Sequence, residues 1–437
     1  MFKPSARPDL FTPEHLAFRD SLRAWVKREI EPHATAWDEA GAIPLTLHRK
    51  AAEIGLLGLG YAEEFGGTPG DVFYSLISAE ELARPGAGGV QCALGTHQIA
   101  LPPIRDTGCA ELQRKVIPPV IAGQKVAALC ITEPGGGSDV AALRTTAVRE
   151  GGHYIVNGEK TFISSGMRAD YLTVAVRTTP QSRGASGISL LLIEGDTPGL
   201  TRHPLQKMGW WASDTAHLHF DNCRVPVAHL IGEEGAGFKA IMRNFNHERL
   251  MMATLSLAYA QVCAEEALAW ARERKTFGEP LAQRQVIRHK LVDMAFAIER
   301  TRTFVYDLAW RLHHHIGPAD DLVARTCMAK VEATRTMQLC ADTSVQILGG
   351  MGFMRGTKSE RLYREVKQRI ARIPGVRLDR HPRIELTGVF AHIGLGKRLN
   401  LLVTGLGQHG LLGRSHAGFL ALAWPLWLGP YGTRRKA

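Results

Sequence analysis

The sequence lacks the features of several large classes of protein. Its seven cysteines are odd in number and include no Cys-x-x-Cys pair. Neither a disulfide framework nor a zinc site is therefore expected, and the thiols fit a reducing compartment. The longest late apolar stretch, 418–428, is interrupted by Pro425 and is too short to span a bilayer. No charged segment followed by an apolar run opens the chain, so we expect no secretory signal and a soluble, cytoplasmic protein.

Acidic residues are scarce in one part of the chain. Residues 371–437 contain ten Lys or Arg and two acids, a net charge of +8, which leaves +3 of the total +11 for the rest. The body carries no basic stripe interleaved with aromatic residues, which argues against nucleic-acid binding. Three histidines, 313–315, stand before Gly317-Pro318. We interpret them as a solvated helix end and expect no metal site.

The length of 437 residues is too great for one hydrophobic core, so more than one domain is expected. Residues 9–125 place apolar residues at helical spacing between Pro and Gly, residues 126–235 follow strand patterns, and residues 236–370 return to long helical patterns. The order predicts an α+β protein with an N-terminal helical domain, a central β domain and a C-terminal helical domain, followed by an atypical tail, 371–437.

Individual elements can be predicted inside these zones. A helix should begin near Thr12-Pro13-Glu14. Asn157-Gly158 reads as a hairpin turn between two paired strands, 154–156 and 160–163. Further strands are predicted over 171–177, 188–194 and 217–220, and long helices over 238–275, 284–314 and 320–348.

The most informative motif follows a strand-like run at 126–131. The run stops at Thr132-Glu133-Pro134 and opens into Gly135-Gly136-Gly137-Ser138. Glycines let the backbone approach a ligand and turn its N–H groups inward, which suits a pyrophosphate or the edge of a flavin. The alternative is an ordinary glycine-rich turn after a strand.

Several further motifs occur in order along the chain, and together they make residues 10–370 similar to the acyl-CoA dehydrogenase family. The resemblance implies the fold of that family, with a C-terminal four-helix bundle, FAD at the domain junction and a homotetramer or homodimer. It also implies an acyl-CoA substrate and an electron-transferring flavoprotein as electron acceptor. The motifs are Thr132 to Asp139, Asn157-Gly158 to Gly166, Lys207-Met208-Gly209 with Ser213-Asp214-Thr215, Gly232 to Phe238, Glu273 to Gly278, and Gln346 to Phe353.

The resemblance also assigns cofactor and substrate residues. Phe162 and Ser164 stand where the family has Trp and Thr, a conservative departure that keeps a ring and a hydroxyl group. Ser138 would touch both FAD and the acyl-CoA, and Asn246 and Arg249 would lie near the substrate. The implied cofactor residues are Leu129, Ile131, Thr132, Gly137, Ser138, Phe162, Ile163 and Ser164, with Arg274, Phe277, Gln285, Gln346, Gly349 and Gly350 reaching the FAD of a neighbouring subunit.

The reaction of the family needs a base for the α-proton, because the α C–H bond of a thioester is only weakly acidic. Many members carry this Glu in a C-terminal Glu-Gly-Thr loop, which is missing after Arg364. Isovaleryl-CoA and long-chain acyl-CoA dehydrogenases carry it on a helix in a Glu-Arg-Leu pattern, which matches Glu248-Arg249-Leu250. The resemblance therefore implies Glu248 as the base and points to a long-chain or branched substrate. The alternative is a solvated helical acid, but the apolar run after Glu248 favours the edge of a core, and His247 is assigned no role.

Two alternatives to this function remain open. A flavin monooxygenase or oxidase of the same fold would react readily with oxygen. A catalytically impaired protein that keeps the fold as a partner or scaffold would fail to hold FAD. The second alternative arises from the tail, 371–437, which matches nothing in the family pattern and is hypothesised to be a shifted reading frame or an unusual replacement.

Overall fold

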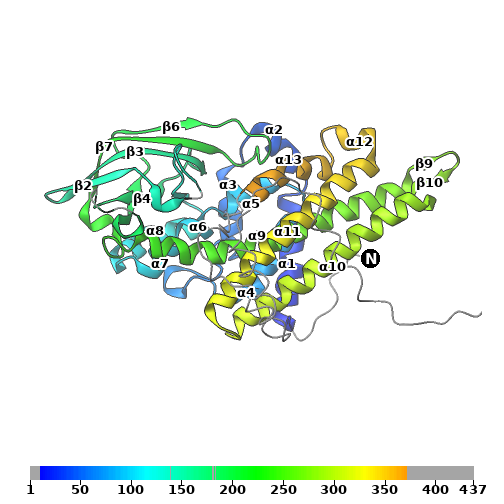
Figure 1. Cartoon of the computed structure of the whole chain (residues 1–437), viewed down its shortest axis with the longest axis horizontal. Helices are drawn as coiled ribbons and strands as arrows, with labels where there is room; N and C mark the ends of the chain where they lie inside the picture. Colours follow the sequence, from blue (N-terminus) through cyan, green and yellow to red (C-terminus); the bar gives the residue numbers. More distant parts are fainter. Residues whose placement is uncertain (1–9, 138, 180–181, 183, 372–437) are drawn as a thin grey trace, which may run out of the picture. The chain divides into compact units, whose positions relative to one another are not determined.

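The computed structural model describes residues 10–137, 139–179, 182 and 184–371, which belong to one compact unit. It has the predicted order of helical, β and helical zones (Figure 1). The predicted tail lies outside the described residues except for Ala371, the last residue of α13. The domain bounds 9–125, 126–235 and 236–370 stay a prediction.

The N-terminal zone is a set of short helices with identifiable start signals. Helix α1 begins at Pro13, as predicted, at a position where a missing N–H has no consequence. The Thr12 hydroxyl accepts from the His15 N–H and caps the helix. Asp71 caps α4 by accepting from the N–H groups of Phe73 and Tyr74. The elements are α1 (Pro13–Glu29), α2 (Ala34–Ala40), α3 (Leu45–Glu53), η1 (Glu63–Phe65), α4 (Val72–Ala83), α5 (Gly88–Gly95), α6 (His97–Ala100), α7 (Pro102–Thr107) and α8 (Ala110–Ile121).

The central zone is one mixed sheet. Its strands run in the order β6-β7-β3-β2-β4-β5-β8, and β1 pairs in parallel with β4. β4 and β5 cover the predicted ranges, and β7 includes the predicted strand 217–220. The elements are β1 (Ala127–Cys130), η2 (Val140–Ala142), β2 (Thr146–Glu150), β3 (His153–Ser164), β4 (Tyr171–Arg177), η3 (Ala185–Gly187), β5 (Ile188–Glu194), β6 (Leu200–Pro204), β7 (Thr215–Pro226), η4 (Val227–His229) and β8 (Leu230–Ile231).

The predicted hairpin turn at Asn157-Gly158 is wrong. Both residues lie inside the single strand β3, and the register with β7 shifts between Val156 and Gly158. The hairpin instead lies earlier in the chain, where Gly151-Gly152 connect β2 to β3. Gly158 has φ +142°, and a Cβ there would stand 2.7 Å from the Cα of Thr145. The glycine therefore serves a bulge and a close backbone crossing rather than a turn.

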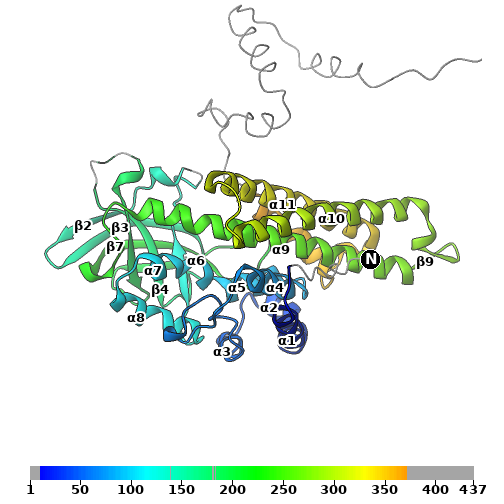
Figure 2. The same ribbon diagram turned by 90° about the horizontal axis from the view of Figure 1, so that it is seen from below.

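Helices α9, α10, α11 and α13, with the short α12, form the C-terminal zone. α9 is long because it contains no Pro and has Gly only at its first residue. It runs from the sheet to the hairpin β9–β10 alongside α10 and α11 (Figures 1 and 2). The elements are α9 (Gly237–Glu273), β9 (Lys275–Thr276), β10 (Glu279–Pro280), η5 (Leu281–Gln283), α10 (Gln285–His313), α11 (Ala319–Leu348), α12 (Gly350–Phe353) and α13 (Lys358–Ala371). Within the described residues, no helix is long and apolar enough to cross a membrane.

Two hydrophobic cores meet along α9. Ile241, near its start, packs with β1, β4, β5, α7 and α8. From Leu250 onward the helix packs with α4, α10, α11 and α13. The segment between these two cores therefore borders the sheet, the N-terminal helices and the C-terminal bundle at once, and the candidate site lies there.

Candidate active site

A cavity of about 160 Å³ lies between the N-terminal helices and the middle of α9. Helices α4 and α5 and the segments 56–59 and 96–99 form its other walls, and Ser164 of β3 and Trp210 complete it. Apart from His247, the α9 residues that line it are spaced i, i+3, i+4 and i+7, the pattern of one helix face. They are Glu248, Met251, Met252 and Leu255.

Glu248 is thus placed on the wall of a mainly apolar cavity that also contains Ser164. The other two residues assigned to the substrate contact each other instead, with Arg249 Nη1 donating to Asn246 Oδ1 at 2.7 Å. Neither is among the described residues that line the cavity. Asn244 anchors this turn of α9, because its Nδ2 donates to the Ile99 carbonyl at 2.7 Å.

The part of the wall formed by α6 carries a hydrogen-bonded histidine. His97 Nδ1 donates to the Leu94 carbonyl at 3.0 Å, and its Nε2 accepts from Gln98 Nε2 at 3.0 Å. Burial lowers the pKa of His97 to about 4. The imidazole is therefore neutral at physiological pH, and both of its nitrogens are used within the wall.

The lowered pKa of His97 predicts that the folded state loses stability in acid. An unfolded His takes up a proton near pH 6.5, whereas folded His97 resists protonation until about pH 4. The folded state should therefore lose stability as the pH falls through this window, by about 3 kcal/mol at pH 4. Urea denaturation at pH 7 and pH 4.5 should show a steeper loss in the parent than in His97→Gln, and equal pH slopes would contradict the assignment.

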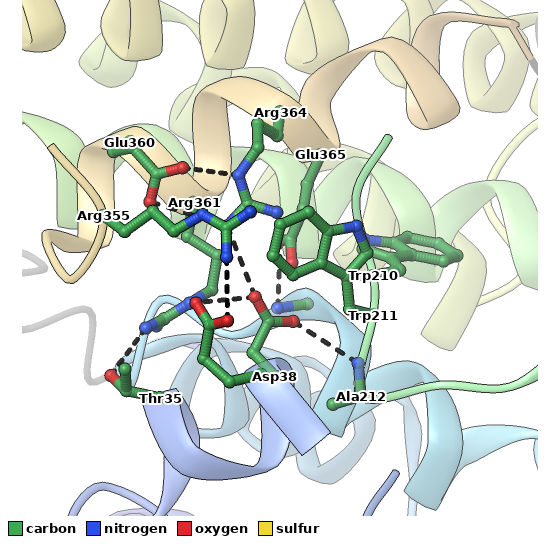
Figure 3. A network of polar contacts seen from close by, with 12 residues as sticks. Thr35, Asp38, Trp210, Trp211, Ala212, Arg355, Glu360, Arg361, Arg364 and Glu365 are labelled. Carbon is green, nitrogen blue, oxygen red and sulfur yellow. Dashed lines mark hydrogen bonds and ion pairs between the residues drawn. The ribbon is translucent and has the colours of Figure 1, made fainter. Parts of the chain in front are cut away.

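Trp210 forms another part of the wall and is held by a network that reaches α13 (Figure 3). Its backbone is left-handed, with φ +58°, and Lys207 Nζ donates to its carbonyl at 2.7 Å. The next ring, Trp211, lies under the guanidinium groups of Arg355 and Arg364, 4.5 and 4.0 Å from the ring centroid. These contacts fix the peptide that carries Trp210.

Buried Asp38 of α2 completes this network (Figure 3). Its carboxylate accepts from the Ala212 N–H at 3.3 Å and pairs with Arg364 at 3.3 Å and Arg361 at 3.6 Å. Glu365, also buried, accepts from the Gly88 N–H at 3.0 Å. The N-terminal helices, the loop before β7 and α13 are thereby tied together behind one wall of the cavity.

The glycine-rich loop after β1 is fixed by a buried ion pair. Lys160 Nζ donates to the Ile131 carbonyl at 3.1 Å and to Glu133 Oε1 at 2.8 Å. Glu133 also accepts from the N–H groups of Arg144 and Thr145 and from the Thr145 hydroxyl. Burial alone would raise the pKa of Glu133, but Lys160 and these donors lower it below its ordinary value. Glu133 is therefore a carboxylate that pins both ends of the loop.

The surface beside the cavity fits FAD. A Cβ at Gly135 would meet nothing within 4 Å, so the backbone of the pinned loop faces open space, as a phosphate or flavin edge requires. Phe162 has φ +61°, a strained conformation for a bulky residue, and leaves 64% of its surface exposed. Strain that presents a bare ring is expected where a planar ligand covers it. Ile163 is buried, Ser164 faces the cavity, and Ser138 lies outside the described residues.

The second group of predicted cofactor residues lies elsewhere on the chain. They occupy the end of α9, the β9–β10 turn, the start of α10 and the end of α11. None of them lines the cavity as the structure describes it. Phe277 is 98% exposed with φ +52°, and the others are exposed as well: Arg274, Gln285, Gln346, Gly349 and Gly350.

Several lining residues have no signal in the sequence. His247 was given no role, yet it lines the cavity, and burial lowers its pKa. Gln98 and Trp210 belong to no chemical motif. Tertiary packing brings them to the site, with α6 against α9 and the 207–213 loop against α5 and α13.

An apolar cavity with a carboxyl group on its wall, beside a surface that fits FAD, defines a flavin-dependent oxidoreductase. Family models for the N-terminal, middle and C-terminal domains of acyl-CoA dehydrogenase match residues 12–124, 128–223 and 235–375. The chain belongs to the acyl-CoA dehydrogenase family, whose cofactor is FAD, and it has the three-domain fold of that family.

Individual relatives agree. The chain is 37% identical to the mitochondrial long-chain specific acyl-CoA dehydrogenase of Mus musculus over 79% of its own length and 80% of the relative's. The crystal structure of a probable acyl-CoA dehydrogenase from Mycobacterium abscessus is similar with 45% identity and a TM-score of 0.79, covering 82% of this chain and 94% of that one. An acyl-CoA dehydrogenase structure from Geobacillus kaustophilus shares 35% identity and a TM-score of 0.79, covering 83% and 94%.

Proposed function

We propose that this enzyme desaturates a long-chain or branched acyl-CoA between its α and β carbons to give trans-2-enoyl-CoA. The observation that carries the proposal is the placement of Glu248 on the wall of the apolar cavity, beside Ser164. Glu248 takes the α-proton onto a carboxylate oxygen. FAD, when bound, accepts the β-hydrogen together with its two electrons.

The other predicted site residues would hold and orient the cofactor and the substrate. The loop backbone at Thr132 and Gly137 would hold the cofactor together with Leu129 and Ile131, and the ring of Phe162 would pack against it. Ser164 offers a hydroxyl group at the junction of this surface and the cavity. The methionines of α9 exclude water from the acyl chain of the substrate, which favours transfer of the α-proton to Glu248 rather than to solvent.

An anaerobic titration of the purified protein with saturated acyl-CoAs tests this function. Bleaching of the flavin absorbance and formation of enoyl-CoA are expected. Oxygen consumption on substrate would instead favour an oxidase or monooxygenase, and a protein that retains no FAD would favour the scaffold alternative.

We also propose a homotetramer or homodimer, an electron-transferring flavoprotein as acceptor, and a cytoplasmic location. The seven free cysteines fit a reducing compartment. The oligomer is supported by large apolar side chains that remain exposed on α10, α12 and the β9–β10 turn, since such patches mark interaction surfaces. They include Phe277, Val286, Phe296 and Phe353.

This surface yields a prediction. Phe353→Asp should weaken subunit association by about 2 kcal/mol, roughly thirtyfold, because a charge then replaces an exposed aromatic side chain that the proposed interface covers. FAD retention should fall with it if subunits share the cofactor site. Light scattering coupled to size exclusion measures the mass, and Val148→Asp in β2 is the control. Unchanged mass in Phe353→Asp would contradict the proposed interface.

A further inference from the structure

Helix α13 holds the turn that joins α4 to α5. Three of its side chains are spaced i, i+3 and i+7, so they lie on one helix face, and they contact the turn in order. The first two donate to carbonyl groups, and the third accepts from an N–H group. The pairs are Lys358 with Arg84 at 3.0 Å, Arg361 with Gly86 at 3.2 Å, and Glu365 with Gly88 at 3.0 Å. Both helices that this turn connects line the cavity, whereas the described residues of α13 do not.

Glu365 serves as the N-terminal cap of α5. The first N–H groups of a helix have no partner within the helix, and Ala87, which precedes α5, has no side-chain oxygen to accept from them. The Glu365 carboxylate supplies this acceptor from another helix and places a negative charge at the positive end of the helix dipole. Because Glu365 is 0% exposed, solvent screens this contact little.

The first turn of α5 is enclosed on two sides. A Cβ atom at Gly88 would stand 2.5 Å from Glu365 Oε2 and 2.6 Å from Trp210 Nε1. At Gly86, where φ is +63°, a Cβ atom would stand 2.7 Å from that of Lys358. These two glycines allow α13 and the indole of Trp210 to approach the backbone closely. The start of α5 is therefore located by contacts and not by its own sequence alone.

Helix α5 transmits this anchoring to the junction of the cavity and the surface that fits FAD. Cys92 follows Gly88 by four residues, about one helical turn. Its thiol donates to Ser164 Oγ at 3.9 Å, and both residues line the cavity. A shift of α5 at its capped end would therefore move the thiol relative to Ser164 and reshape this part of the wall.

We propose that Glu365 is a positioning residue for the reaction. By capping α5, it holds the part of the wall next to Ser164 in place while the acyl group reacts. The inference rests on the proposed function and adds to it a residue that acts through α5 and not on the substrate. Since a small displacement of a reacting group costs more in rate than in affinity, loss of the cap should lower the rate of flavin reduction more than the binding of the thioester.

Hydrogen exchange of the FAD-loaded protein, followed by mass spectrometry, tests the cap directly. In Glu365→Ala, the N–H groups of the first turn of α5 should exchange about fivefold faster, the effect of losing one cap. Glu365→Gln should stay closer to the parent, because its amide oxygen can still accept from the Gly88 N–H. Lys367→Ala, at an exposed position of α13, is the control and should exchange as the parent does. Unchanged exchange in Glu365→Ala would overturn the inference.

Anaerobic stopped-flow reduction by octanoyl-CoA tests the effect on the reaction. Per bound FAD, the limiting rate should fall about tenfold or more in Glu365→Ala. The Kd of the thioester should stay within about threefold of the parent, and Glu365→Gln should recover most of the rate. A parental rate in folded, FAD-loaded Glu365→Ala would overturn the inference and leave the proposed function standing. A parent protein whose flavin no thioester reduces would overturn the proposed function itself.

Gly88→Ala tests the same contact from the other side and replaces Glu365→Ala if that variant does not fold. The added methyl group would collide with Glu365 Oε2, so the rate should fall and the start of α5 should exchange faster. A purely local effect would act in the opposite direction, because alanine favours a helix more than glycine does. Parental rate and slower exchange in Gly88→Ala would therefore overturn the inference.

Discussion

Glu248→Gln should reduce the rate of flavin bleaching by acyl-CoA by about three orders of magnitude. The amide keeps the shape of the side chain on the cavity wall but cannot accept the α-proton. Binding of FAD and of the thioester should persist, because the substitution leaves the apolar walls and the glycine-rich loop in place. Stopped-flow absorbance under anaerobic conditions measures the rate, and equilibrium titration measures thioester binding.

A matched substitution separates this loss from a general effect of removing charge from α9. Glu265 lies on the same helix, outside the cavity, and its Oε1 accepts from Gln261 at 2.9 Å. Glu265→Gln should bleach at the parent rate. Near-parental bleaching in Glu248→Gln would show that another group takes the proton, and His247 is the neighbouring residue that lines the same cavity.

Lys160→Met should lower the free energy of unfolding by about 3–5 kcal/mol, because it leaves Glu133 as an uncompensated buried charge. The loop after β1 should also lose its anchor at the Ile131 carbonyl, so FAD should dissociate more readily. Urea denaturation measures the first effect, and fluorescence of released flavin measures the second.

Two further variants test whether the loss of stability in Lys160→Met is caused by the unpaired charge of Glu133. Lys125→Met removes a lysine whose Nζ lies 2.7 Å from Asp170 in an exposed pair, where solvent screens the charge, so little change is expected. Combining Lys160→Met with Glu133→Gln should recover much of the lost stability, since no charge is then left buried. A loss in the double variant as large as in Lys160→Met would mean that packing of the lysine stem, not its charge, holds the loop.

Local patterns in the sequence were sufficient for much of the fold. The strands 171–177 and 188–194 and the three long helices follow hydrophobic periodicity, which burial imposes directly on the residues concerned. Glu248 was singled out by its match to the Glu-Arg-Leu pattern of the family, and the apolar run after it argued only against a solvated helical acid. The family pattern then supplied its role, which no periodicity contains.

Other features could not be predicted from local patterns, because they depend on distant segments. Asn157-Gly158 has the composition of a hairpin turn, but a glycine is needed at 158 because the backbone of Thr145 lies too close to leave room for a Cβ atom. The left-handed backbone of Phe162 follows from a register shift between Lys160 and Ile163 against β7. The wall of His97 and Gln98 exists only where α6 meets α9.

The anchoring of Trp210 has a consequence for how the gene can vary. Every contact described behind that wall, from Asp38 to Glu365, is made upstream of the point near Gln368 where the composition changes. The cavity walls described above are encoded earlier still, between residues 56 and 255. Inherited variation in these described walls and in the contacts that hold them must therefore arise in codons that precede this point.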